Sequence, residues 1–488
     1  MAQTHFVCYF CCKLRRKFMD DKFEGYNEEQ INNMVSRFEE MIGQGKNHFF
    51  DMDEFEVIID FYLETNNLKN ADIALKRAIQ QYPKAVSLLL KKAQYFAFSN
   101  KTEKALDLLS EIESLEPFNT DIFFTRGAIY SQMQKYEKAI EEYNKAISNN
   151  EDLEEVYSNI AFEYENLGNY SKAIDYLKKV LEINPENESS IYELALNYEY
   201  DGRIGESVVY LQNFINETPF SRAAWFNLGV AYAQLGETEK SIDAYDYAIV
   251  IDPNYINAYY NKAQLLTISG RFDKAIELFH ELLEFDQNQE VVYYHIAETY
   301  EKAEDFESAL TYYLKSISYD QEFADSWSGM AVCYQELGKL NQAKDAMSKA
   351  IALSQDNADF YLVMADIEWK LGSLVHSELN YRKAIVLNPE NSDIWLDMSD
   401  IYAEAEDFET ALQVIEEAIN LFPANDLLIY RKAAYYFLEG DRKLGFHFLQ
   451  MAMILNPLST LEFLEYDDRI ADDLEINQLI LDFLHTND

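Results

Sequence analysis

The chain has 488 residues, of which 41 are basic and 86 are acidic, and its formal net charge is −45. Lysine and arginine drive binding to phosphate groups, so this charge argues against DNA, RNA or an anionic membrane surface as the main partner. Hydrophobic residues make up 48% of the chain and aromatic residues 15%, which excludes an acidic disordered tail and leaves material for a large core.

Residues 1–18 differ from the rest of the chain. They contain four basic residues, no acidic residue and three of the four cysteines, Cys8, Cys11 and Cys12. The apolar run 6–12 precedes the basic residues, which is the reverse of the order in a signal peptide. We expect a disordered extension, and a palmitoylated anchor stays open as the alternative because the thiols lie beside basic residues. No cysteine or histidine pair follows at a zinc-ligand spacing, so no metal site is predicted.

Residues 19–51 form the predicted N-terminal capping region. Their apolar residues recur at helical spacing over 27–43, which predicts one helix that covers the first unit behind it. Neither this region nor any later one has an apolar run long enough to span a membrane, so we expect a cytoplasmic protein without a membrane span.

From residue 52 onward the chain repeats itself. Consecutive prolines are separated by 34 residues or a multiple of 34: Pro83, Pro117, Pro185, Pro219, Pro253, Pro389, Pro423 and Pro457. The same period divides residues 52–459 into twelve units of 34 without an insertion or deletion. We number the positions of each unit from 1, starting at Met52. A fixed period of this length indicates a repeat fold whose stacked units bury a continuous core.

Each unit has the pattern of two amphipathic helices. Position 8 is small in eleven units and position 20 in all twelve, for example Gly229 and Ser241 in the sixth unit. Two helices approach closely only where small residues face each other, so these positions predict a tight hairpin. Position 11 is mostly tyrosine, which fills the space between hairpins. Proline at position 32 stops the second helix because it lacks the N–H that a helix interior needs.

One unit carries a recognisable motif, W-x2-L-G-x2-Y. Its residues are Trp225, Leu228, Gly229 and Tyr232, and tryptophan recurs at the first of these positions as Trp327 and Trp395. With this motif and period the chain resembles the tetratricopeptide repeat family over 408 of its residues. The resemblance implies an all-α, right-handed superhelical solenoid of helix-turn-helix repeats. It also implies that positions 2, 5, 6, 9, 12 and 13 of the first helices line a concave groove.

Residues 460–488 follow the last unit. Their apolar pattern, which includes the stretch DDLEINQLILDFL, predicts a C-terminal capping helix. A terminal unit needs such a cover because its outer face would otherwise expose apolar side chains to water.

Catalysis is not predicted anywhere in the repeats. The seven histidines are scattered without a metal-ligand spacing, and no nucleophile elbow, P-loop or dinucleotide fingerprint is present. Paired carboxylates occur throughout so acidic a chain and therefore select no site. We expect no enzyme activity, no cofactor and no metal.

Aromatic residues occupy inward positions through the middle of the chain. They are Phe124, Tyr192, Phe226, Tyr260 and Tyr294 at position 5, with Phe162 at position 9. Such a stripe could hold apolar side chains of an extended or helical segment. Aromatic residues at helical spacing also serve as core, so groove contact and packing against neighbours both stay open.

Acidic residues collect at the inward positions of units eight to eleven. Ten of these 24 positions are acidic: Glu298, Glu301, Asp325, Glu336, Asp359, Asp366, Asp393, Asp397, Asp400 and Glu404. Only Lys302 and Lys370 oppose them. A basic peptide or protein face would be steered to this part of the groove, although selection for solubility alone would also enrich acidic residues.

The sequence therefore predicts a non-catalytic scaffold for protein–protein interaction. Its partner is a protein or peptide, basic in character, bound in the concave groove through the aromatic and acidic residues, and not a nucleic acid. The alternative is a chaperone-like or regulatory subunit that holds many basic client proteins weakly. A monomer and a weak homodimer both stay open, because faces between repeats can also support self-association.

Overall fold

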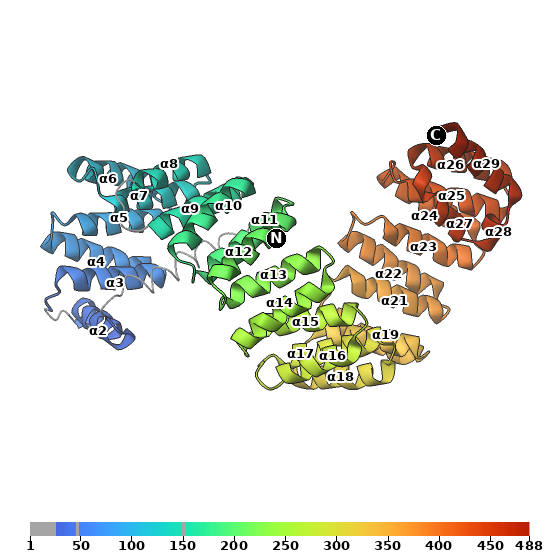
Figure 1. Ribbon diagram of the computed structural model, residues 1–488, viewed down its shortest axis with the longest axis horizontal. Helices are drawn as coiled ribbons and strands as arrows, with labels where there is room; N and C mark the ends of the chain where they lie inside the picture. The colour runs from blue at the N-terminus through green and yellow to red at the C-terminus, as the bar shows by residue number, and fades with distance from the viewer. Residues whose placement is uncertain (1–25, 45–47, 148–152, 488) are drawn as a thin grey trace. The chain divides into compact units, whose positions relative to one another are not determined.

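The computed structural model describes residues 26–44, 48–147 and 153–487, and the predictions for residues 1–18 lie outside this part of the chain. Among the described residues the regular structure is helical, with no strand (Figure 1). The chain divides into two compact units, each made of several 34-residue repeats: the first ends at Pro253 and the second begins at Asn254. Below, 'first unit' and 'second unit' mean these two compact units, and a repeat is named by its number. The all-α repeat fold predicted from the sequence is confirmed.

In the described part of the first unit, one helix precedes a series of helical hairpins. The elements are α2 (Glu28–Gln44), α3 (Met52–Glu64) with α4 (Leu68–Gln81), α5 (Val86–Phe98) with α6 (Thr102–Leu115), α7 (Thr120–Gln132) with α8 (Tyr136–Ile147), α9 (Leu153–Asn166) with α10 (Tyr170–Ile183), α11 (Glu188–Tyr200) with α12 (Ile204–Glu217), and α13 (Arg222–Gln234) with α14 (Thr238–Ile251). The predicted helix over 27–43 corresponds to α2.

The second unit continues the series and ends in shorter helices. Its hairpins are α15 (Ile256–Ile268) with α16 (Phe272–Leu282), α17 (Gln289–Lys302) with α18 (Phe306–Tyr319), α19 (Ala324–Glu336) with α20 (Leu340–Leu353), α21 (Ala358–Lys370) with α22 (Leu374–Leu387), α23 (Asp393–Glu404) with α24 (Phe408–Leu421), and α25 (Asp426–Glu439) with α26 (Arg442–Leu455). A 3-10 turn (Pro457–Ser459) then leads to α27 (Thr460–Glu465), α28 (Asp468–Ala471) and α29 (Leu474–Asn487).

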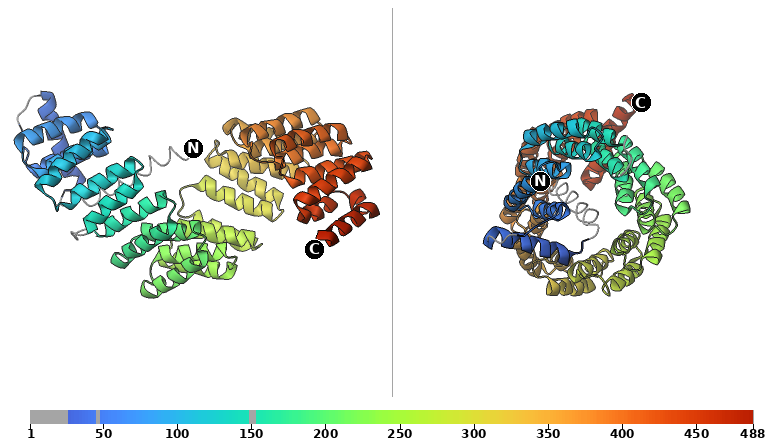
Figure 2. Two further views of the ribbon diagram at one scale, coloured as in Figure 1. Left: turned by 90° about the horizontal axis from the view of Figure 1, so that it is seen from above. Right: turned by 90° about the vertical axis from the view of Figure 1, so that its left-hand side faces the viewer.

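The hairpins follow the 34-residue period closely. The helices α3 and α5 begin at Met52 and Val86, and the departures from the period, at Leu153, Gln289 and Asp393, are one residue each. Consecutive hairpins also pack side by side within each unit, for example α10 against α11 and α18 against α19 (Figure 2). Each first helix therefore occupies an equivalent place between its neighbours.

Every hairpin turns at the same position of the repeat. Position 15 has a left-handed backbone in all twelve units: Asn66, Asn100, Gln134, Gly168, Gly202, Gly236, Gly270, Glu304, Gly338, Gly372, Glu406 and Gly440. Glycine adopts this conformation without steric cost, which explains why it occupies seven of these positions. The residue ends the first helix and reverses the chain.

Small residues bring the two helices of a hairpin together. The hydroxyl of Ser241, at position 20 of α14, donates a 2.7 Å hydrogen bond to the carbonyl of Gly229, at position 8 of α13. A Cβ atom added to Gly229 would lie 2.6 Å from the ring of Tyr245, and one added to Gly127 would lie 2.5 Å from the ring of Tyr143. The second helix thus fills the place of the missing side chain, and a larger residue there would force the hairpin apart.

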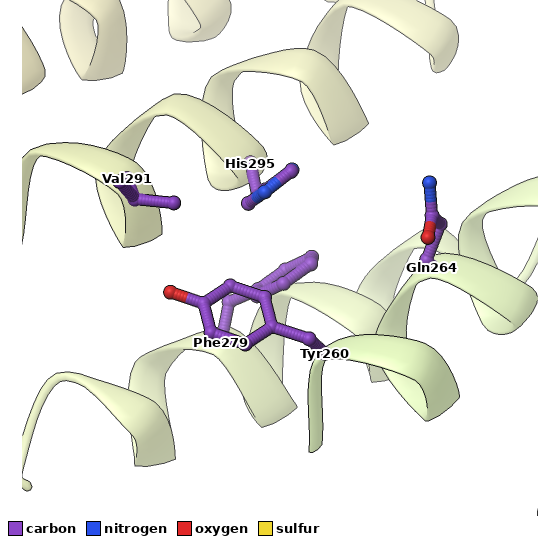
Figure 3. A pocket seen from close by; sticks show the side chains of 5 residues that line it. All are labelled: Tyr260, Gln264, Phe279, Val291 and His295. Atoms are coloured by element: carbon purple, nitrogen blue, oxygen red, sulfur yellow. The ribbon is translucent and has the colours of Figure 1, made fainter. Parts of the chain in front are cut away.

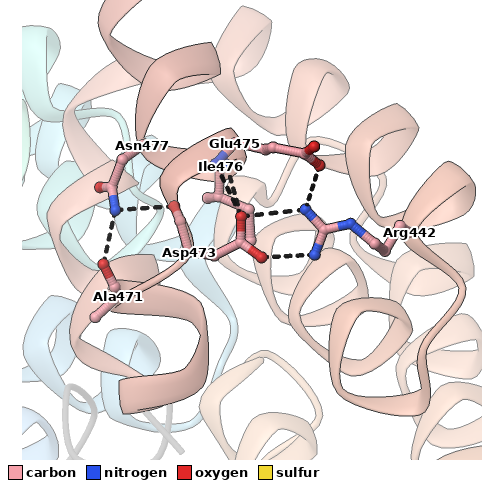
Figure 4. A network of polar contacts seen from close by, with 6 residues as sticks. All are labelled: Arg442, Ala471, Asp473, Glu475, Ile476 and Asn477. Carbon is pink, nitrogen blue, oxygen red and sulfur yellow. Dashed lines mark hydrogen bonds and ion pairs between the residues drawn. The ribbon is translucent and has the colours of Figure 1, made fainter.

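The C-terminal segment differs from its prediction, because three helices replace the single capping helix expected over 460–488. Aspartates break the segment: Asp467 caps α28, and the Asp473 side chain accepts hydrogen bonds from the backbone N–H groups of Glu475 (3.0 Å) and Ile476 (3.1 Å) at the start of α29. Arg442 of α26 binds Asp473 at 2.5 Å and Glu475 at 2.7 Å, which ties α29 to the last hairpin (Figure 4). Arg442 also lowers the pKa of Asp473 to about 2.

Candidate functional site

In the first unit, the aromatic residues at position 5 pack within the fold. The ring of Phe124 lies 5.9 Å from that of Tyr143, and the ring of Phe226 lies 5.8 Å from those of Tyr192 and Tyr245. Phe226 is only 8% exposed, so its ring belongs to the core. Phe124, Tyr192 and the position-9 residue Phe162 are half-buried. These aromatic rings therefore pack against neighbouring side chains, and their contact with a partner stays a prediction.

In the second compact unit, Tyr260 and Tyr294 pack against neighbouring side chains in the same way. Tyr260 lies 6.1 Å from Phe279 of its own hairpin, and its hydroxyl donates a 2.8 Å hydrogen bond to Asp286. Tyr294 lies 5.9 Å from Tyr313. Burial is the main cause that raises the pKa of both hydroxyl groups, and nearby carboxylates add to it. Both tyrosines are half-buried.

A pocket lies between α15, α16 and α17, with a volume of about 210 Å³. Tyr260, Gln264, Phe279, Val291 and His295 line it (Figure 3). The prediction from sequence named only Tyr260 of these five. The signal that could have found three others was already present, since Gln264, Val291 and His295 stand at inward positions 9, 2 and 6.

Two of the predicted acidic residues, Glu298 and Glu301, already have partners in the chain. Glu298 contacts His295 at 3.2 Å and Lys302 at 3.4 Å, and its pKa is lowered chiefly by the bond to His295. Glu301 accepts a 2.7 Å hydrogen bond from the hydroxyl of Tyr313, and burial raises its pKa. These two carboxylates are therefore poorer candidates for binding a partner than their positions in the repeat indicate.

Asp400 is also engaged, through residues that follow it in the chain. Arg431 forms an ion pair with it, and the hydroxyl groups of Tyr435 and Tyr466 donate hydrogen bonds of 2.7 and 2.9 Å to it. The guanidinium of Arg431 also lies over the ring of Tyr466, 3.9 Å from its centre. Tyr466 belongs to the C-terminal capping segment, so this network fastens that segment to α23 and satisfies the charge of Asp400.

The remaining predicted acidic residues have fewer partners. The exposed Glu404 accepts a 2.8 Å hydrogen bond from the indole of Trp369. Asp366 accepts a 2.8 Å hydrogen bond from the hydroxyl of Tyr381. Among the predicted acidic residues within the described ranges, four aspartates have neither a hydrogen bond to their carboxylates nor an ion pair, although the charge of Arg431 acts on the last of them: Asp325, Asp359, Asp393 and Asp397.

We define the acidic face as four exposed aspartates on two neighbouring first helices. They are Asp359 and Asp366 on α21, and Asp393 and Asp397 on α23. The pKa of Asp397 is raised to about 6, first because the carboxylate is partly removed from water, and then because Asp400, Asp366 and Asp393 are close enough to repel its charge. Asp366, Asp393 and Asp397 are therefore close together in space.

We call the place where the first helices of two consecutive repeats meet a joint. At two joints of the chain a lysine or arginine neutralises an aspartate at the same pair of repeat positions. Asp60, at position 9 of repeat one, lies 2.6 Å from Lys91, at position 6 of repeat two. Asp400 and Arg431 stand at the same two positions of repeats eleven and twelve and form an ion pair. Position 9 of one repeat and position 6 of the next thus face each other at both joints.

The joint between α21 and α23 has a different charge at the same two repeat positions. Its position 9 is Asp366 and its position 6 is Asp397, so two carboxylates stand where the other joints have an aspartate and a cation. A cation from outside the chain would find both carboxylates exposed at this joint.

No group of three or more histidine, cysteine or acidic residues within residues 26–44, 48–147 and 153–487 is arranged to hold a metal ion. Over the same residues, every helix is too short or too polar to cross a bilayer.

Sequence comparisons identify the repeats in several parts of the chain. Models described as tetratricopeptide repeat match residues 154–187, 223–255, 244–277, 300–372 and 380–413, and a model described as TPR repeat matches residues 127–168. No curated protein matches the chain in sequence.

Solved structures with a similar fold include two complexes and one tetratricopeptide repeat protein. The APC/C hetero-tetramer Cut9-Hcn1 is 13% identical, with 84% of this chain and 93% of that chain covered and a TM-score of 0.38. A tetratricopeptide repeat protein from Parabacteroides merdae is 18% identical, with 51% and 99% covered and a TM-score of 0.41. Naa15/Naa10 bound to HypK-THB is 15% identical, with 83% and 68% covered and a TM-score of 0.33.

Proposed function

Because the chain is a tetratricopeptide repeat protein, we propose that it is a non-catalytic scaffold whose second unit holds a basic segment of a partner protein on the acidic face. Repeats of this family form a protein-interaction fold that is typically non-catalytic. The observation that carries the proposal is the joint between α21 and α23. It places Asp366 opposite Asp397, where two other joints of the chain have an ion pair.

Asp366 and Asp397, which have no ion-pair partner among the described residues, lower the stability of the protein when no binding partner is present. The raised pKa of Asp397 reflects its partial burial first and then repulsion by Asp400, Asp366 and Asp393, which Arg431 offsets in part. A lysine or arginine at position 6, as at the other two joints, would remove the cost. A partner that brings its own cation would gain from the same charges, and salt would weaken its binding.

Affinity capture with the full chain tests the proposal. The protein is immobilised at low salt, and a cell extract is passed over it and eluted in salt steps. We expect one stoichiometric basic protein that moderate salt releases. The variant D366N/D393N/D397N should bind that protein about 3- to 150-fold more weakly, because each of three exposed ion pairs contributes about 0.2–1 kcal/mol.

A matched variant controls for the change of net charge. E390Q/E409Q/E439Q removes three exposed carboxylates outside the acidic face, in the loop after α22, on α24 and at the end of α25. It should capture the partner as the wild type does. Equal weakening by both variants would reduce the effect to net charge alone. Many weakly held basic proteins in place of one would favour the alternative of a client-holding subunit.

A further inference from the structure

We infer that the pocket between α15, α16 and α17 receives one large apolar side chain of the basic segment that the acidic face binds. The inference rests on the proposed function, because it names a second contact of the same partner. The pocket and the acidic face both belong to the second unit.

The pocket occupies a joint that the chain does not fill with an ion pair. Gln264 is at position 9 of repeat seven and His295 is at position 6 of repeat eight. Asp60 and Lys91 occupy the same two positions of repeats one and two, where they form an ion pair. Gln264 is exposed, and Figure 3 shows its side chain and that of His295 on either side of the open space. The joint therefore stays open to an outside group.

The surface of this pocket is mostly carbon. The hydroxyl of Tyr260 is engaged with Asp286 at 2.8 Å, and Nδ1 of His295 with Glu298 at 3.2 Å. The imidazole is stacked on the ring of Phe279, with the ring centres 5.6 Å apart and the planes 9° apart. The half-buried rings of Tyr260 and His295 and the methyl groups of Val291 are left to meet a ligand, so the pocket suits an apolar side chain.

Size and charge define the occupant further. A cavity of about 150 Å³ accommodates benzene, so a pocket of about 210 Å³ admits a side chain from leucine to phenylalanine in size. Two carboxylates bond residues that line the pocket, Asp286 to Tyr260 and Glu298 to His295, so acidic groups border it. A basic segment is the complementary ligand, and one apolar residue within it would act as the anchor.

The test uses a random library of twelve-residue peptides displayed on phage and selected on the full chain at low salt. We expect the selected peptides to share one leucine, isoleucine, methionine or phenylalanine at a fixed distance from a basic cluster. Replacement of that residue by alanine in a fluorescently labelled peptide should weaken binding about 10- to 100-fold, the range for burial of one large apolar side chain.

Pocket variants locate the anchor. Q264W places an indole at the mouth of the pocket and should weaken the anchored peptide about as much as the alanine replacement does, while the affinity for the alanine peptide stays unchanged. Q94W is the matched control, because Gln94 is a glutamine at the same repeat position of α5. Circular dichroism checks the fold, and V291A, which enlarges the pocket, should shift the preferred anchor toward larger side chains if Q264W does not fold.

The outcomes separate this inference from the proposed function. Selected peptides without a shared apolar residue, or a preference that both Q264W and V291A leave unchanged, would overturn the pocket assignment even if D366N/D393N/D397N abolishes binding. Loss of binding in Q264W with no effect of the aspartate variant would retain the pocket and overturn the basic segment.

Discussion

Two neighbouring joints of the second unit use the same repeat positions in opposite ways. At the joint between α23 and α25, Asp400 is neutralised by Arg431 and hydrogen-bonded by two tyrosines. At the joint between α21 and α23, Asp366 stands opposite Asp397 without an ion pair in the described part of the chain, and Arg431 of the next joint offsets only part of the repulsion on Asp397. Both joints keep the 34-residue spacing, so the fold depends on the small and apolar positions and tolerates either charge at positions 6 and 9. Charged residues at positions 6 and 9 can therefore either stabilise the fold through an ion pair or bind a partner.

The largest effect should come from breaking the most buried neutralised joint. Lys91 and Asp60 have side chains that are 9% and 13% exposed, so Lys91→Met would leave a buried carboxylate without its cation. We expect a loss of about 3 kcal/mol of local stability. Repeat arrays do not unfold in one step, so amide hydrogen exchange in α3 and α5 is the suitable measurement. The double variant D60N/K91M should recover most of the loss; no recovery would assign the effect to packing of the lysine stem.

A smaller loss should follow at the joint with more solvent. Arg431 and Asp400 have side chains that are 15% and 28% exposed, and Tyr435 and Tyr466 still bond Asp400 when the cation is gone. We expect Arg431→Met to lower local stability by about 2 kcal/mol, measured as faster amide exchange in α23 and in α27. Faster exchange in α23 without any change in α27 would show that Tyr466 alone fastens the capping segment.

Supplying the missing cation should convert the unpaired joint into a paired one. D397R places an arginine opposite Asp366, in the register of Arg431 and Asp400. We expect a gain of about 0.5–1 kcal/mol in thermal or urea unfolding, because the pair is exposed, together with loss of the captured partner. E409R makes the same change of charge on α24 and should affect neither property. A more stable D397R protein that still captures the partner would contradict the proposed role of the acidic face.

The smallest effect concerns pH. The pKa of Asp397 in the folded chain is about 6, above its ordinary value of 3.8, so its favourable contribution is complete below about pH 4 and is lost as the pH rises through 6. Asn resembles the protonated aspartate, so D397N should match the wild type at pH 4 and be more stable at pH 7 by less than about 1 kcal/mol, reduced by solvent screening. Equal stability at both pH values would show that the repulsion at this joint is negligible.

Sequence reasoning located the hairpins because their determinants are local. Proline at position 32 and small residues at positions 8 and 20 recur with the period, and the first helices begin within one residue of it. The turn position was harder to predict from the sequence, because Asn66, Gln134 and Glu304 adopt there the left-handed backbone that glycine adopts in other repeats. The C-terminal helices lie outside the repeat, and there the aspartate caps broke an apolar pattern that had predicted one helix.

The candidate site was only partly predictable for a different reason. The inward positions come from the repeat register, but the partners of a carboxylate come from elsewhere in the chain. Tyr313, which bonds Glu301, belongs to a second helix, and Tyr466, which bonds Asp400, belongs to the capping segment. The pocket was missed because Gln264 and His295 are ordinary residues whose importance lies in the space between them.

The constant spacing also links the number of repeats to the charge of this surface. Since position 9 of one unit faces position 6 of the next, a gene deletion that removed residues 392–425 would bring Asp366 before Arg431 and leave every such aspartate at this end neutralised. A tandem duplication of the same stretch would set Asp400 of one copy before Asp397 of the other and add a second unpaired joint. Changes in repeat number would therefore tune electrostatic binding in steps, without any point substitution.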